Sequence, residues 1–110
     1  MEFERDGQNL VITQERGCKS VTLSLSGPAT ARYVERVIPV FREAIFTRKQ
    51  VIVDFSKTRV IDSRFLGLLL MLRKKLEGTG AGPIIVGLSP RLESIFRYND
   101  LEFLLVNKVV

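Results

Sequence analysis

Residues 51–67 read Val-Ile-Val-Asp-Phe-Ser-Lys-Thr-Arg-Val-Ile-Asp-Ser-Arg-Phe-Leu-Gly, and this stretch decides the fold. Its first five residues are mostly apolar and β-branched, which is typical of a strand buried on both faces at the centre of a sheet. A loop over 56–63 leads into the leucine-rich stretch 64–77, which carries its cations at the end and stops before Gly78, a good helix C-cap residue. The pattern predicts a strand followed by a helix.

The downstream sequence repeats this alternation. Residues 83–88 form a second short apolar run, which predicts another buried strand. Ser89 and Pro90 then supply the N-cap and the first-turn proline of a third helix. After a turn at 99–100, the apolar run 103–106 predicts a final strand.

The upstream sequence predicts an antiparallel start. Residues 20–26 alternate Val or Leu with Ser or Thr, as in a strand with one solvated face. The β-prone run 10–13 precedes a turn at Gly17, so the two segments predict a hairpin at the edge of the sheet. From Thr30 the apolar residues recur at helical spacing, which predicts an amphipathic helix that Pro39 should kink or start late.

The predicted order is therefore β-β-α-β-α-β-α-β. Such a chain forms an α/β fold, with a mixed sheet that has a parallel centre, right-handed crossovers and helices packed against it. The length of 110 residues suits one domain, so we assign residues 1–110 to a single domain.

Composition and charge exclude several classes of function. The longest apolar run, 68–72, is far shorter than the roughly 20 residues of a membrane span, and the N-terminus lacks a signal-peptide pattern, so we expect a cytoplasmic protein without membrane insertion. The net charge of +5 is spread from Arg5 to Lys108. The tightest cationic run, 73–75, fits a helix end and has no interleaved aromatic residues, so we expect no nucleic-acid partner.

The sequence carries little that could support catalysis. It has no histidine, and its single cysteine, Cys18, can form neither an internal disulfide nor a metal site, so we expect no enzymatic activity, metal or cofactor. The glycine-rich segment 78–82 joins a helix to a strand, the reverse of a phosphate-binding loop. Asp54 and Asp62 could be paired as acid and base, but a strand end and a helix cap are the simpler assignments.

The junction Val60-Ile61-Asp62-Ser63-Arg64-Phe65-Leu66-Gly67, together with residues 51–56 and 86–90, resembles the STAS domain of sulphate transporters and anti-sigma factor antagonists. The resemblance extends from the strand that ends at Gly27 to the last apolar run. Family members commonly read Asp-Ser-Ser-Gly-Leu-Gly at the junction, and in the antagonists the serine after the aspartate is phosphorylated by a partner kinase. The resemblance makes Ser63 the corresponding phosphorylation candidate.

The resemblance also implies a mechanism and a partner. In the family mechanism, the unphosphorylated domain docks on an anti-sigma factor or serine kinase-like protein and frees a sigma factor, and phosphorylation ends the docking. Arg64 and Phe65 replace the second Ser and the Gly of the family motif, and Thr30 stands where the family often has an aspartate near the phosphorylation site. Phe65 would either obstruct the partner or form an exposed aromatic anchor. The candidate partner-binding residues are Asp62, Ser63, Arg64, Phe65, Leu66 and Thr30.

Two other functions are compatible with the resemblance. One is a phosphorylation-independent STAS module within a larger assembly, associated with a transporter or a glycosyltransferase. The other is a small-molecule-sensing STAS domain. Because one helix rarely buries two leucine stripes, exposure of Phe65, Leu66 or Leu70 would mark a partner surface. The sequence leaves open whether the protein forms a homodimer.

Overall fold

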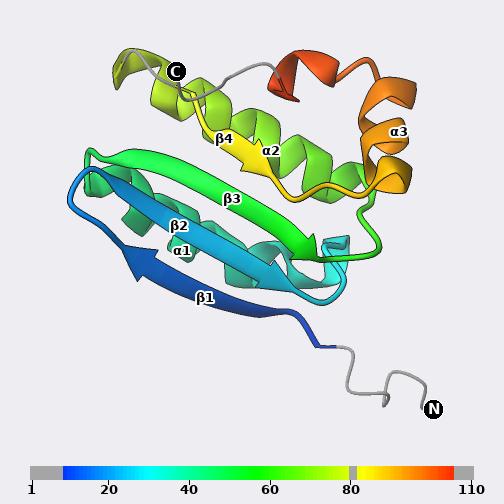
Figure 1. The fold of residues 1–110 in the computed structure, drawn as a ribbon, viewed down its shortest axis with the longest axis horizontal. Coiled ribbons are helices and arrows are strands. Elements are labelled where there is room, and N and C mark those ends of the chain that lie inside the picture. The colour runs from blue at the N-terminus through cyan, green and yellow to red at the C-terminus, as the bar shows by residue number, and fades with distance from the viewer. Residues whose placement is uncertain (1–8, 80–81, 106–110) are drawn as a thin grey trace.

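The alternating sequence of strand β2 (Ser20–Ser26) sets the two faces of the sheet. Val21, Leu23 and Leu25 are buried on one face, and the intervening hydroxyl residues are half-buried on the other. The computed structural model describes residues 9–79 and 82–105 (Figure 1). Within them, β2 forms with the bounds that its alternation predicts.

In the described part of the chain, the sheet has four strands in the order β1-β2-β3-β4. Strand β1 (Val11–Arg16) pairs antiparallel with β2, and β3 (Gln50–Lys57) pairs parallel with β2 on its other side. The short strand β4 (Ile84–Val86) pairs parallel with β3. The mixed sheet, its parallel centre and the hairpin at its edge are therefore confirmed.

The three α-helices of residues 9–79 and 82–105 follow the predicted order. Helix α1 (Val34–Phe46) is preceded by a 3-10 turn over 31–33 and contains the exposed Pro39. Helix α2 (Ser63–Leu76) and helix α3 (Pro90–Tyr98) complete the set. No helix of the described residues is long and apolar enough to cross a membrane.

The two longer helices cover one face of the sheet. Figure 1 shows α1 and α2 on the same side of β2 and β3. Strand β3 is accordingly buried at Val51, Val53 and Phe55, whereas Ile52 and Asp54, which point to the other face, are only half-buried. The expectation that this strand is buried on both faces is wrong, because the described residues place α1 and α2 over only one of its faces.

The core between sheet and helices is centred on large aromatic side chains. Phe55 from β3 and Phe65 from α2 are both fully buried and meet edge to face, with ring centroids 6.5 Å apart. Phe96 of α3 is also fully buried. The edge-to-face arrangement places the electropositive rim of one ring against the face of the other.

The final strand expected over 103–106 is not formed by its described residues. Glu102–Leu105 is instead a 3-10 turn, and Val106 lies outside the described part of the chain. The backbone reverses at Asp100, which adopts a left-handed φ of 58°, and the buried residues Leu101 and Leu104 are then three positions apart. That spacing matches a 3-10 helix and conflicts with the two-residue period of a strand.

Candidate functional site

The N-terminus of α2 is built around the Asp62 side chain. Asp62 has an extended backbone and acts as the N-cap, since one carboxylate oxygen accepts a hydrogen bond from the Phe65 N–H at 3.0 Å. Its backbone carbonyl accepts the first helical hydrogen bond, from the Leu66 N–H. Aspartate suits this position because its carboxylate satisfies an N–H group that has no partner within the helix. The predicted capping role of Asp62 is therefore confirmed.

The second carboxylate oxygen of Asp62 holds a distant loop against this helix end. It accepts a hydrogen bond from the Ala31 N–H at 2.7 Å. A short parallel bridge runs beside it, in which the Ala29 N–H donates to the Val60 carbonyl at 2.9 Å and the Asp62 N–H donates to the Ala29 carbonyl at 3.2 Å. Thr30 lies between the two tied residues, so the structure brings its loop to the start of α2.

Four of the six candidate residues contribute to an accessible surface at this point. Ser63 and Arg64, the first two residues of α2, are exposed, and Thr30 and Asp62 are half-buried. Among the described residues, the Ser63 hydroxyl has no hydrogen-bond partner. We call these four residues the α2 N-terminal surface.

The other two candidates, Phe65 and Leu66, lie in the core. Their side chains are 0% and 2% exposed, so the expectation of an aromatic anchor at Phe65 is wrong. With the helix capped at Asp62, the third helical residue turns inward, and the Phe65 ring packs against Phe55. Leu70 is half-buried. Of the second leucine stripe, Leu66 is therefore buried and only Leu70 remains partly accessible.

The two aspartates considered as an acid and base pair have separate structural roles. An Asp54 oxygen accepts hydrogen bonds from the backbone N–H of Ser56 at 2.9 Å and from its hydroxyl. Both oxygens of Asp62 accept bonds from backbone N–H groups. Within residues 9–79 and 82–105, no cluster of three His, Cys, Asp or Glu side chains could hold a metal.

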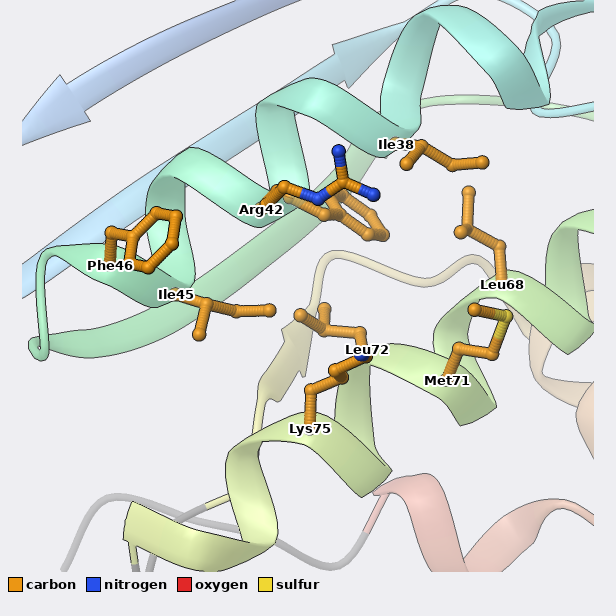
Figure 2. A pocket seen from close by; sticks show the side chains of 9 residues that line it. Ile38, Arg42, Ile45, Phe46, Leu68, Met71, Leu72 and Lys75 are labelled. Atoms are coloured by element: carbon orange, nitrogen blue, oxygen red, sulfur yellow. The ribbon is translucent and has the colours of Figure 1, made fainter.

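A second feature was not found by sequence reasoning. A groove of about 300 Å³ runs between α1 and α2 (Figure 2). Phe46 and Met71 lie on its rim and are 77% and 55% exposed. Large apolar residues at two solvent-facing helix positions were the feature of the sequence that could have indicated this groove. We call it the α1–α2 groove, and it is lined by Ile38, Phe41, Arg42, Ile45, Phe46, Leu68, Met71, Leu72 and Lys75.

Solved structures with this arrangement include anti-sigma factor antagonists. The Bacillus cell fate determinant SpoIIAA in its phosphorylated form is 22% identical with a TM-score of 0.68, over 90% of this chain and 92% of that one. Unphosphorylated SpoIIAA is 24% identical with a TM-score of 0.66, over 80% and 83% of the two chains. An anti-sigma factor antagonist from Mycobacterium paratuberculosis is 16% identical with a TM-score of 0.79, over 91% and 86%. At these identities the likeness shows a shared SpoIIAA-like fold.

Sequence comparison gives the family. No curated protein matches the sequence. A family model described as "Mlab, STAS domain" matches residues 7–106, which include every described strand and helix. The chain belongs to the STAS domain family.

Proposed function

We propose that this chain is a protein-binding regulatory domain of the anti-sigma factor antagonist type, and not an enzyme. Its partner is an anti-sigma factor or a serine kinase-like regulator. The partner contacts the α2 N-terminal surface, and phosphorylation of Ser63 ends the contact.

One observation carries the proposal: Ser63 is an exposed serine at the first position of α2, and its hydroxyl has no hydrogen-bond partner among the described residues. A kinase could reach this hydroxyl without breaking an interaction of the fold. The neighbouring Asp62 fixes both the helix end and the Thr30 loop, so the surface is held in one shape before a partner arrives. A preformed surface loses less conformational entropy on binding.

The position also explains how a phosphate could act as a switch. Phosphoserine adds about −1.5 to −2 charges and three acceptor oxygens. The N-terminal end of α2 and the adjacent Arg64 guanidinium would stabilise that charge within the chain. A partner packed on the unmodified surface would meet a bulky, strongly hydrated anion instead. The expected result is a large loss of affinity.

The test is recovery of the tagged full chain from its native cells, with peptide mapping and identification of bound proteins. We expect phosphate on Ser63 in part of the population and an anti-sigma factor or serine kinase-like protein bound only to the unmodified part. Ser63→Glu should lose that protein, and Ser63→Ala should retain it. Ser94→Glu, which adds the same charge at an exposed serine of α3, is the matched control and should retain it.

Two outcomes would overturn parts of this proposal. If Ser63 stays unmodified across growth conditions and Ser63→Glu retains the partner, the phosphorylation switch is wrong. If no anti-sigma factor or kinase-like protein is bound to any form of the chain, the antagonist function is wrong.

A phosphorylation-independent binding module in a transporter- or glycosyltransferase-associated assembly is the second candidate. It is favoured by the bulky, exposed Arg64 directly beside Ser63 and by Thr30, which offers no carboxylate near the serine. In this case the partner should bind Ser63→Glu and wild type alike, and Arg64→Glu should weaken binding.

A further inference from the structure

The α1–α2 groove has an apolar interior that solvent can reach. Phe41 and Leu72, one from each helix, are almost fully buried beneath it. Phe46 and Met71 stand at its rim and are largely exposed. Apolar side chains gathered around a hollow, with a few polar groups beside them, are typical of ligand-binding sites. Occupation of the groove would remove both rim residues from water.

Two cations border this apolar surface. Arg42 comes from α1 and Lys75 from α2, and both are exposed and line the groove. Figure 2 shows the Arg42 side chain extending from α1 toward the gap between the helices. Neither cation has a hydrogen bond or ion pair with any residue that the structure describes. Lys74 adds a third positive charge where it lines a neighbouring hollow with Met71 and Lys75.

We propose that the α1–α2 groove binds a single-chain amphiphilic anion, such as an alkyl carboxylate. The alkyl chain occupies the apolar groove, and the anionic head lies between the Arg42 guanidinium and the Lys75 ammonium. The volume of about 300 Å³ is at the lower end of small-ligand sites, so it suits one alkyl chain better than a two-chain lipid. The two positive charges at the groove mouth would fix the direction of the alkyl chain, because they attract its anionic head.

Other occupants fit the charges and shape less well. In a two-fold dimer built on this face, the same cations of both copies would come close together, which is unfavourable. A flat membrane surface matches the cationic rim but not the hollow between the helices. The groove lies over residues 68–75 of α2, one to three turns beyond the α2 N-terminal surface, and the inference does not rest on the proposed partner.

The test is a titration of the ¹⁵N-labelled full chain with octanoate and decanoate below their micelle concentrations. We expect saturable backbone amide shifts confined to residues that line the groove. Each added methylene should tighten binding about two- to fourfold, as for an alkyl group that leaves water wholly or in part. Decyltrimethylammonium, a cation of the same chain length, should bind about tenfold more weakly because its head meets Arg42 and Lys75.

Matched variants distinguish binding at the α1–α2 groove from non-specific electrostatic attraction of the anion to a basic protein. Arg42→Gln with Lys75→Gln should weaken decanoate binding about tenfold, since each charge contact contributes a factor of about three. Lys57→Gln with Arg91→Gln removes two exposed cations elsewhere and should leave the affinity unchanged. Both double variants keep the core residues, so thermal unfolding should show that they fold like wild type.

Three results would overturn the inference. The first is decanoate shifts that do not saturate or that spread over the whole surface. The second is equal loss of affinity in the two double variants. The third is binding to anionic two-chain phospholipid vesicles that depends on Arg42 and Lys75 while decanoate itself does not bind, which would reassign the cations to a membrane surface.

Discussion

One oxygen of the Asp62 carboxylate accepts a hydrogen bond from the Ala31 backbone N–H at 2.7 Å, across 31 positions of sequence. The other oxygen caps α2 through the Phe65 N–H. A single side chain therefore joins the loop after β2 to the helix that starts at Ser63. This double role makes Asp62 the structural support of the proposed contact surface.

We predict that Asp62→Ala lowers the free energy of unfolding by about 2–3 kcal/mol. Loss of the cap costs about 1 kcal/mol, and the partly buried Ala31 N–H loses a charged acceptor, which costs a further 1–2 kcal/mol or so. Urea denaturation measures the change. Ser89→Ala is the matched control, because Ser89 caps only the Leu92 N–H of α3 and should cost about 1 kcal/mol. Equal losses in the two variants would contradict the double role.

The burial of Phe65 predicts a second, larger effect. Phe65→Ala removes a fully buried ring that contacts Phe55, so it should destabilise the fold by about 3–5 kcal/mol. The adjacent Arg64→Ala is exposed and should stay within about 0.5 kcal/mol of wild type. Thermal or urea unfolding of both variants provides the measurement. A Phe65→Ala protein as stable as Arg64→Ala would mean that the ring is not in the core.

Two glycines should respond to alanine with opposite signs. Gly87 has a φ of +79°, and a Cβ there would lie 2.5 Å from Asp54 Oδ1, so Gly87→Ala should cost about 1–3 kcal/mol. Gly67 lies inside α2, and an added Cβ would meet no atom within 4 Å apart from its chain neighbours and the backbone of its own helix. Gly67→Ala should stabilise the protein by about 0.5–1 kcal/mol through helix propensity. Melting temperatures that move in the same direction would contradict this contrast.

The C-terminal turn can be tested through its contact with α2. The Arg73 guanidinium lies 5.1 Å from the centroid of the Phe103 ring, and this ring is partly exposed. Arg73→Gln should therefore cost about 0.5–1 kcal/mol, the range for an exposed cation–π pair. Lys74→Gln, at the next and exposed position, should cost nothing measurable. The same comparison in a Phe103→Leu background should show no difference between the two variants.

The predicted fold was most accurate where a pattern identified a single face. Strict alternation over 20–26 predicted β2 residue by residue, because each apolar side chain points to the helices. The Ser89-Pro90 pair predicted the start of α3 through cap chemistry that is local in sequence. The apolar run 103–106 has no two-residue alternation, and its described residues, 103–105, belong to a 3-10 turn that follows the left-handed residue Asp100.

The candidate site was predicted in part for the same reason. Asp62 was predicted as a helix cap from its local sequence, and Ser63 was identified through the family resemblance; the structure places both at the start of α2. The burial of Phe65 depends on how the capped helix meets Phe55, a contact between elements that no local pattern contains. The α1–α2 groove arises from the space between two helices, and single-helix periodicity cannot describe such a space.

The bridge between Ala29 and Ile61 has a consequence for the order of folding. It closes a segment that contains all of α1 and β3, so an isolated bridge would carry the entropy cost of a long loop, and we expect it to form once the pairing of β2 with β3 has already closed that loop. Only then can Asp62 reach Ala31 while it caps α2. A partner that binds this helix end would thus bind the folded domain and not a nascent or misfolded chain, even though both forms contain Ser63.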